Sequence, residues 1–240
     1  LEGNDGADWL QGGSNDDIIV YNSSTAIDGQ AETIDGGSGN DIIAVAVSAA
    51  NFTEATVTGI ETLRLDYDGA DVALSPEALA GITNFRTTNL YGGNSYGEVV
   101  RMGRSGTFDF AGKSIDVNVW MFGSAGADTM LGASLTDAMS GAEGADSLSG
   151  GGGNDIFFYL TGQDVTGFAE TVDGGLGADQ IWLGSAFSGS FSAATVSGVE
   201  SVYLLNGADG TFRADQLQAF STMAAFTGAH GTVRMAAPAV

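Results

Sequence analysis

Cysteine is absent from the 240-residue sequence, which also has only two prolines, one histidine and one lysine. Without cysteine, no disulfide and no thiolate metal site can form. No apolar run approaches the roughly 18 residues that a membrane-spanning helix needs. Basic residues are scarce as well, since seven Lys and Arg stand against 30 Asp and Glu. The formal net charge of -23 repels phosphate backbones and anionic lipids, so nucleic acid and membrane surfaces are poor candidate partners.

The chain nevertheless has the composition of a folded protein. Hydrophobic residues make up 43% of it, with 13 Phe, 6 Tyr and 3 Trp, whereas disordered acidic chains are poor in such residues. Crowded carboxylates repel one another by about 4 kcal/mol for a pair ~4 Å apart at an effective dielectric near 20. A bound cation removes this repulsion and is one way to stabilise a protein that has no disulfides. The composition therefore favours a folded, metal-stabilised protein.

A nine-residue repeat is the strongest pattern in the sequence. Four copies follow one another from Gly123 to Phe158: GSAGADTML, GASLTDAMS, GAEGADSLS and GGGGNDIFF. Further copies begin at Gly3, Gly12, Gly36 and Gly174, and degenerate copies begin at Ile27 and Val165. The sixth position of these copies is acidic: Asp8, Asp17, Glu32, Asp41, Asp128, Asp137, Asp146, Asp155, Glu170 and Asp179.

The eighth position tests the repeat independently, because the register was set by the acid alone. This position is apolar in every copy: Leu10, Ile19, Ile34, Ile43, Met130, Met139, Leu148, Phe157, Val172 and Ile181. In a sequence with 43% hydrophobic residues, chance would give this roughly once in several thousand trials. The repeat therefore reflects a structural unit.

These nonapeptides resemble the G-G-x-G-x-D-x-U-x repeat of the repeats-in-toxin (RTX) family, which binds calcium on a β-helix. Calcium takes about six to eight oxygen ligands from carboxylates and carbonyls. Glycines at the first, second and fourth positions allow positive φ and let carbonyls approach an ion. The strand after each turn then points its apolar residue inward. The resemblance implies an all-β fold, a right-handed parallel β-roll or β-solenoid with calcium-binding turns in two similar units.

The resemblance also implies which acids share an ion, since in the RTX β-roll calcium lies between one turn and the next turn but one. The resulting pairs are Asp8 with Glu32, Asp17 with Asp41, Asp128 with Asp146, Asp137 with Asp155, Asp146 with Glu170, and Asp155 with Asp179. We therefore expect about six calcium ions. The fourth position, where Gly is expected, is occupied by other residues in the turns of Glu32, Asp137 and Glu170, which fit less well: Gln30, Leu135 and Phe168.

A longer duplication spans the chain. AETIDGGSGNDII from Ala31 matches AETVDGGLGADQI from Ala169, and ATVTGIETLRL from Ala55 matches ATVSGVESVYL from Ala194. We therefore expect two units, 1–122 with RTX turns in 3–44, and 123–240 with RTX turns in 123–182. Each continues into a metal-free β segment, in one continuous solenoid. Such segments after calcium turns resemble, more weakly, those of bacterial surface-layer proteins and adhesins.

A few elements outside the repeats can be predicted. Alternation over 115–122 predicts one strand with Ile115, Val117, Val119 and Met121 on one face, and residues 107–110 alternate in the same way. Residues 75–81 have an N-cap serine, a first-turn proline and a final glycine, which predict a helix. Its counterpart in the second unit is expected over 213–217.

The RTX resemblance implies a calcium-binding structural module of a secreted or cell-surface bacterial protein. Such chains are exported unfolded by type I secretion and fold outside the cell, where calcium is abundant. A role in a surface layer, filament or adhesin follows, with neighbouring copies or other domains of a longer chain as partners. Because the chain begins at Leu1 instead of Met, we expect it to be part of a longer protein.

The alternative is a calcium-stabilised carbohydrate-binding or polysaccharide-modifying module of a secreted enzyme. Tyr91, Tyr96, Arg101 and Arg104 are close in sequence and could line a sugar groove, or be ordinary strand and loop residues. Catalytic candidates are few: one histidine, His230, with no G-x-S-x-G or H-E-x-x-H motif. We therefore predict no enzymatic activity.

Overall fold

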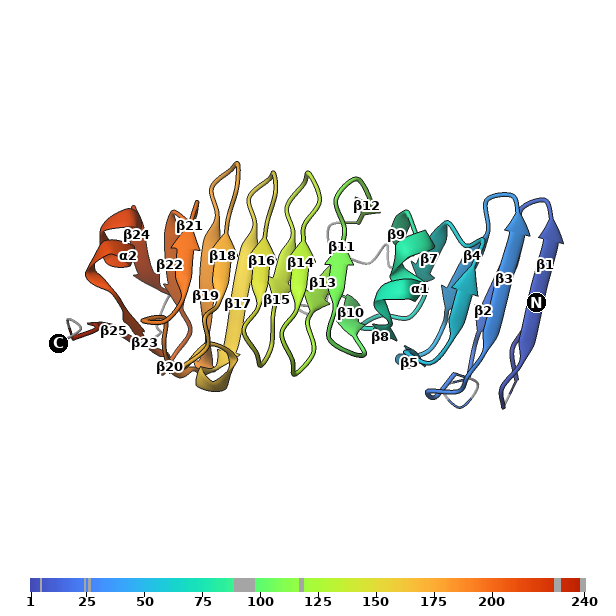
Figure 1. Ribbon diagram of the computed structural model, residues 1–240, viewed down its shortest axis with the longest axis horizontal. Coiled ribbons are helices and arrows are strands. Elements are labelled where there is room, and N and C mark those ends of the chain that lie inside the picture. Colours follow the sequence, from blue (N-terminus) through green and yellow to red (C-terminus); the bar gives the residue numbers. More distant parts are fainter. Residues whose placement is uncertain are drawn as a thin grey trace. The chain divides into compact units, whose positions relative to one another are not determined.

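The computed structural model describes residues 1–4, 6–23, 25, 27–88, 98–116, 119–226 and 230–237. They form two compact units, Leu1–Phe122 and Gly123–Val240. Each unit consists almost entirely of parallel strands wound into successive coils, which confirms the predicted all-β solenoid. Figure 1 shows these strands side by side within each unit, joined by turns along the edges. No helix among the described residues is long and apolar enough to cross a membrane.

The first unit has three faces of parallel strands. One face has the order β1-β3-β6, the second β2-β4-β7-β9-β12, and the third β5-β8-β10-β13. The strands are β1 (Trp9–Ser14), β2 (Ile18–Tyr21), β3 (Thr33–Ser38), β4 (Ile42–Val45), β5 (Ala49–Phe52), β6 (Thr56–Thr58), β7 (Thr62–Leu65), β8 (Asp71–Leu74), β9 (Asn84–Thr87), β10 (Glu98–Met102), β11 (Thr107–Asp109), β12 (Ser114–Ile115) and β13 (Val119–Phe122). The one helix described here is α1 (Pro76–Gly81), which packs against β6 and β11.

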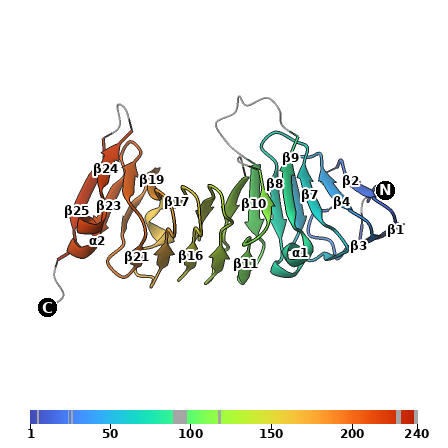
Figure 2. The same cartoon turned by 90° about the horizontal axis from the view of Figure 1, so that it is seen from above.

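The second unit repeats this plan. Its faces have the orders β14-β16-β18-β21, β15-β17-β19-β22-β24 and β20-β23-β25. Figure 2 views these strands from above. The elements are β14 (Thr129–Leu131), β15 (Ala138–Ser140), β16 (Ser147–Ser149), β17 (Ile156–Thr161), η1 (Gly162–Asp164), β18 (Thr171–Asp173), β19 (Gln180–Ala186), β20 (Ser188–Ser190), β21 (Thr195–Ser197), β22 (Ser201–Leu204), β23 (Asp209–Phe212), α2 (Ala214–Ala219), β24 (Thr222–Ala225) and β25 (Thr232–Met235).

The eighth position of the repeat lines the core. The pairing register of the parallel strands places Ile19 of β2 beside Ile43 of β4, and Phe157 of β17 beside Ile181 of β19. Nine of the ten residues predicted at this position are buried, and Leu10 in the first strand is half-buried. Stacking identical positions of successive coils buries a continuous apolar column, which no single nonapeptide could form alone.

Coil length increases where residues are inserted. Asp128 and Asp146 occupy equivalent places 18 residues apart, which is two nonapeptides per coil. Asp155 and Asp179 are 24 residues apart, and the six additional residues, 159–164, complete β17 and form η1. Aromatic side chains fill the wider coils; for example, the rings of Tyr159 and Phe191 meet edge to face at 4.9 Å.

Both predicted helices are present. Ser75 caps α1 by accepting a hydrogen bond of 3.1 Å from the Ala78 N–H, with Pro76 in the first turn. The helix expected over 213–217 forms as α2, one residue later than predicted at its start.

The single strand predicted over 115–122 is wrong. β12 ends at Ile115 and pairs with β9, whereas β13 begins at Val119 and pairs with β10 on another face. Residues 117–118 lie outside the described residues. The chain therefore passes from one face of the coil to the next within a stretch whose alternation suggested a single strand, and alternation alone does not mark such a corner.

Candidate metal centre

The ten predicted acids lie in rows that we call acid ladders, each formed by acids that precede equivalent strands of successive coils. The structure adds one acid to two of these ladders, Glu61 in the first unit and Glu200 in the second. The four ladders are Asp8-Glu32, Asp17-Asp41-Glu61, Asp128-Asp146-Glu170 and Asp137-Asp155-Asp179-Glu200.

Main-chain amides connect the acids within a ladder. The N–H of Asp128 donates to Asp146 Oδ1 at 2.8 Å, and the N–H of Asp146 donates to Glu170 Oε2 at 3.1 Å. On the other edge the N–H of Asp155 donates to Asp179 Oδ1 at 2.7 Å. The contacts Asp17 to Asp41 (2.7 Å) and Asp137 to Asp155 (2.8 Å) are of the same kind. Five of the six expected pairs are thus in direct contact.

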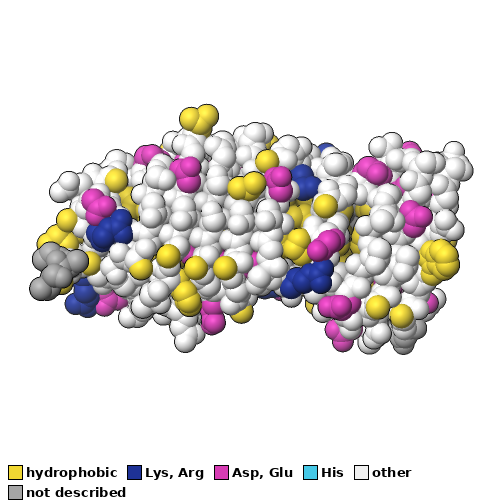
Figure 3. All heavy atoms as spheres, in the orientation of Figure 1, with side chains coloured by type: hydrophobic (Ala, Val, Ile, Leu, Met, Phe, Trp, Pro, Cys, Tyr) yellow, Lys and Arg dark blue, Asp and Glu magenta, His cyan; other side chains and the backbone are white. Residues whose placement is uncertain are grey.

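The sixth pair, Asp8 and Glu32, is held by the backbone. The N–H of Thr33 donates to the Asp8 carbonyl at 2.9 Å, which places the two acids in successive coils. Asp8 and Asp17 are half-buried, and the other eight predicted acids are buried. The rows therefore lie inside the turns, and only scattered acidic side chains are visible on the face drawn in Figure 3.

Several of these carboxylates have a buried oxygen with no hydrogen-bond partner. The atoms are Asp17 Oδ2, Glu32 Oε1, Asp41 Oδ2, Asp146 Oδ2, Asp155 Oδ2 and Asp179 Oδ2. Leaving a buried polar atom unpaired costs about 1–3 kcal/mol, and more when it is charged. Six such atoms in equivalent places indicate a missing positive partner and not isolated defects.

The first-position glycines explain where that partner fits. A Cβ built on Gly174 would lie 2.6 Å from Asp179 Oδ2 and would also collide with the Gly198 carbonyl. A Cβ built on Gly150 would collide with Asp155 Oδ2 and would lie 2.6 Å from the Gly174 carbonyl. A carboxylate oxygen and a carbonyl oxygen therefore face the same glycine. Without a cation between them, these two partial negative charges would repel.

Glycine is thus required at the first position for close approach and not for positive φ, which corrects one expectation. Positive φ occurs at the second and fourth positions, as in Gly151 (88°) and Gly153 (123°). Among the described residues other than glycine, only Asn15 and Ala142 have positive φ, and both lie at these positions. The turn with Leu135 in the fourth position forms without a positive φ at that residue, and Asp137 keeps its place in the ladder.

The described donors fit calcium. Among these residues, no group of three or more His, Cys, Asp and Glu side chains converges on one point. Each pair therefore offers two carboxylates, and backbone carbonyls such as that of Gly174 must complete the ligand set. A mixture of carboxylate and carbonyl oxygens is typical of calcium, whereas zinc prefers nitrogen and sulfur.

Burial raises the pKa of the ladder acids in the second unit. Desolvation is the main cause, and neighbouring carboxylates of the same ladder add to it for Asp146 and Asp155. The pKa rises to about 6 for Asp137, about 7 for Asp146 and Asp155, and about 8 for Glu170. Raised pKa values mean that the metal-free fold resists the charged form of these groups.

Sequence reasoning missed Glu61 and Glu200. The N–H of Asp41 donates to Glu61 Oε2 and the N–H of Asp179 donates to Glu200 Oε2, each at 2.8 Å. The signal was present, because both acids follow a glycine and precede an apolar strand in the duplicated segments GIETL and GVESV. It was hidden because the glycine of these turns lies only two positions before the acid, so the nonapeptide register does not apply.

Among the described residues, the other candidates are bound to groups outside the ladders. Arg101 is bound to Asp71 at 2.7 Å, and Arg104 forms an ion pair with Glu77. Tyr91 and Tyr96 lie outside the described residues. The single lysine, Lys113, donates to the carbonyls of Leu79, Ala80 and Ile82 at the end of α1. His230 is exposed, and its backbone N–H donates a hydrogen bond to Asn206 Oδ1.

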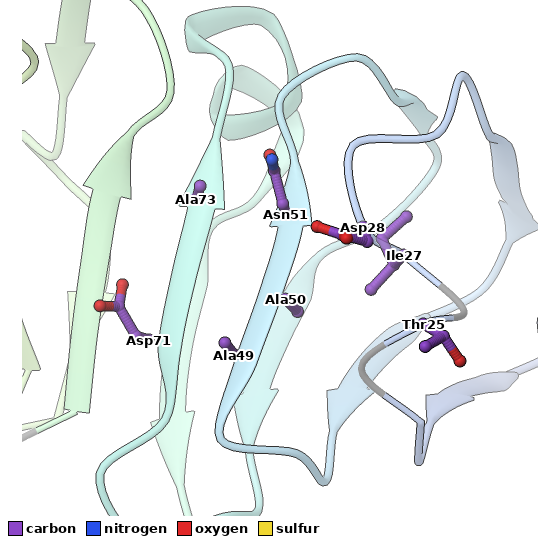
Figure 4. A pocket seen from close by; sticks show the side chains of 8 residues that line it. All are labelled: Thr25, Ile27, Asp28, Ala49, Ala50, Asn51, Asp71 and Ala73. Atoms are coloured by element: carbon purple, nitrogen blue, oxygen red, sulfur yellow. The ribbon is translucent and has the colours of Figure 1, made fainter.

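A surface pocket of about 310 Å³ lies in the first unit, apart from the ladders. Figure 4 shows Asp28 and Asn51 on one side of it and Asp71 on the other. Asp71 is already paired with Arg101, and none of the lining residues is a ladder acid or a histidine. The pocket is lined by Thr25, Ile27, Asp28, Ala49, Ala50, Asn51, Asp71 and Ala73. Its described lining has two titratable side chains, Asp28 and Asp71.

Comparison with protein families finds the RTX calcium-binding nonapeptide repeat in four stretches of the chain, residues 1–23, 28–44, 131–165 and 166–186. These stretches contain nine of the ten predicted acids, and Asp128 joins them through its contact with Asp146. Comparisons with curated proteins and with solved structures found no match.

Proposed function

We propose that this chain, which carries RTX calcium-binding nonapeptide repeats in both of its units, is a structural module that folds when calcium binds to its acid ladders. RTX repeats bind calcium and are typical of secreted bacterial proteins. The residues that would hold the ions are Asp8, Asp17, Glu32, Asp41, Asp128, Asp137, Asp146, Asp155, Glu170 and Asp179.

One observation supports this proposal above all. Asp155 and Asp179 each have a buried oxygen with no hydrogen-bond partner, and a glycine carbonyl faces the same space as that oxygen. A cation supplies the missing positive charge and stabilises the folded state without binding the unfolded chain in the same way. Hydrogen bonds from main-chain amides to carboxylates hold the acids of successive turns in register.

The energetics are sufficient for calcium to control folding. A site at ten times its dissociation constant stabilises the fold by about 1.4 kcal/mol. Six such sites, one for each expected pair, would contribute roughly 8 kcal/mol, which compares with the whole stability of an ordinary domain, about 5–15 kcal/mol. In a cell with little free calcium this contribution is absent and the carboxylate repulsion remains.

Circular dichroism in chelator and in millimolar calcium tests the proposal. We expect little β structure in chelator and a cooperative gain of β signal on adding calcium. Magnesium at the same concentration is the control, because its stricter octahedral geometry suits this mixed ligand set poorly. A cooperative β fold that forms equally in chelator would contradict the proposal.

We further propose that the module serves an outer surface of the bacterial cell, in a surface layer, filament or adhesin. The support is that both units consist of stacked parallel coils that carry RTX repeats, which are typical of secreted bacterial proteins. Neighbouring copies or other domains of a longer chain are the expected partners. Electron microscopy with and without calcium tests this extension, which predicts ordered assemblies in calcium alone.

Carbohydrate binding is the second candidate, favoured by aromatic side chains on the outer side of β19 and β22. The rings of Trp182 and Phe226 meet at 5.1 Å, and those of Tyr203 and Phe226 at 5.7 Å, with Phe226 38% exposed. The equivalent positions in the first unit are Ala44 and Arg64, so the solenoid does not require aromatics there. A glycan array on the wild type and on Trp182→Ala distinguishes this candidate from a purely structural module.

A further inference from the structure

All four acid ladders end in glutamate. The last acids are Glu32, Glu61, Glu170 and Glu200, and every earlier member is aspartate. Glu32 and Glu170 belong to nonapeptide copies, but Glu61 and Glu200 lie outside them and outside the four stretches that match the RTX repeat. The aspartates that precede these two, Asp41 and Asp179, are 0% exposed, and each has one carboxylate oxygen without a partner.

Those unpartnered oxygens face the turns that carry Glu61 and Glu200. A Cβ built on Gly36 would lie 2.8 Å from Asp41 Oδ2 and would also collide with the Gly59 carbonyl. In the second unit, Gly174 has the same neighbours, Asp179 Oδ2 and the Gly198 carbonyl. In each unit a buried carboxylate oxygen thus converges with a carbonyl of the glutamate turn on one point.

The shape of this last turn explains why its acid is glutamate. In a nonapeptide, the glycine whose carbonyl faces the site lies five residues before the acid, as Gly174 does before Asp179. Gly198 provides the equivalent carbonyl only two residues before Glu200, with φ of +61°. This turn is therefore three residues shorter than a nonapeptide turn. We infer that the additional methylene of glutamate lets Oε2 reach the N–H of Asp179.

We propose that Asp41 with Glu61, and Asp179 with Glu200, each bind a further calcium ion beyond the nonapeptide repeats. The inference rests on the proposed function, since it extends the same ladders by one site in each unit. The ligands are the free Oδ2 of the aspartate, the carboxylate of the glutamate and the glycine carbonyl, all hard oxygen donors suited to calcium. Both instances arise from separate stretches of sequence, residues 58–61 and 197–200, and reach the same geometry.

These ions would join each calcium-binding block to the β segment that follows it. Glu61 immediately precedes β7 and Glu200 immediately precedes β22, and both strands pair with strands of the nonapeptide turns, β4 and β19. The next coil has no acid in the equivalent place. There, Thr83 and Ser221 donate to the carbonyls of Glu61 and Glu200, so the ladder ends at the glutamates.

Counting bound calcium by native mass spectrometry tests the inference on Glu61→Gln, Glu200→Gln and the double variant. The amide oxygen of glutamine can still accept the Asp41 or Asp179 N–H, so the turn is preserved while the charged ligand is lost. We expect each single variant to bind one ion fewer than the wild type and the double variant two fewer. Glu143→Gln, at an exposed position, is the matched control and should bind the wild-type number.

Asp155→Asn, measured alongside, separates the two proposals. If Asp155→Asn loses calcium and the glutamine variants keep the wild-type number, the further inference is overturned and the proposed function stands. If neither loses calcium, the proposed function itself fails. Should Glu200→Gln not fold in calcium, Glu200→Asp is counted in its place: its charge is retained but its shorter arm should still lose one ion, and a wild-type number would overturn the inference.

Discussion

Tyr159 Oη donates a hydrogen bond of 3.0 Å to Glu170 Oε1, and both side chains are buried. Tyr21 makes the same contact with Glu32 in the first unit, at 2.6 Å. The phenol gives a buried ladder carboxylate a neutral donor, and burial raises the pKa of the tyrosine well above its usual range. This pair was not predicted from the sequence, although the spacing of 11 residues is the same in both units.

Replacing Tyr159 by Phe should destabilise the calcium-bound fold by about 1–3 kcal/mol, because Glu170 then loses a buried donor. Urea unfolding in saturating calcium measures the loss. Tyr203→Phe is the matched control, because this half-exposed tyrosine lies on the outer side of β22 and has no ladder contact. Equal urea midpoints for Tyr159→Phe and the wild type would show that the bond does not stabilise the fold.

Asp155 should contribute more to calcium binding than Asp128, because it belongs to two pairs and Asp128 to one. The N–H of Asp137 donates to Asp155, and the N–H of Asp155 donates to Asp179, whereas Asp128 is the first member of its ladder. We expect Asp155→Asn to raise the calcium midpoint of folding by on the order of tenfold, and Asp128→Asn by less. Calcium titrations followed by circular dichroism compare them, and equal shifts would argue against shared ligands.

Gly150→Ala should impair the calcium turn, because the new Cβ would collide with Asp155 Oδ2 and lie 2.6 Å from the Gly174 carbonyl. Gly152→Ala is a control within the same turn, since its Cβ would have no neighbour closer than 3.8 Å and its φ is not positive. Thermal unfolding in calcium should show a clear loss for the first variant and a change within about 0.5 kcal/mol for the second. Similar losses for both would mean that the close approach at Gly150 is unimportant.

The calcium-free chain should become less stable as pH rises. The folded pKa values of Asp146 and Asp155 are about 7, and that of Glu170 is about 8, against ordinary values of 3.8 and 4.5. An acid whose pKa is raised in the folded state stabilises the fold when it is protonated. This stabilisation is fully present below pH ~4 and is lost as the pH rises through about 7 to 8. We therefore expect metal-free protein to show more β structure at pH 4.5 than at pH 8.

Circular dichroism of metal-stripped protein across this pH range measures the effect, and calcium added at pH 8 should restore the β signal. A metal-free chain that gains β structure on going from pH 4.5 to pH 8 would contradict the expected sign.

The sequence predicts what is periodic in this molecule and misses what departs from the period. The column of Ile19 and Ile43 follows from the nine-residue spacing, and the contact of Asp137 with Asp155 agrees with the pairing that the RTX resemblance implies. Glu200 was missed because its turn is shorter than a nonapeptide, and Tyr159 because a phenol buried beside a carboxylate has no sequence signature. The break after Ile115 was missed because a corner between faces does not interrupt alternation.

A crystal structure determined in calcium, with an anomalous difference map, tests the central claim most directly. The account predicts one ion between each two paired acids of a ladder. One such ion would be bound by Asp155 Oδ2 and the Gly174 carbonyl, which face the same glycine in this structure. A well-ordered fold in calcium with no anomalous peak in these turns, and with the Asp155 and Asp179 oxygens still unpartnered, would contradict it.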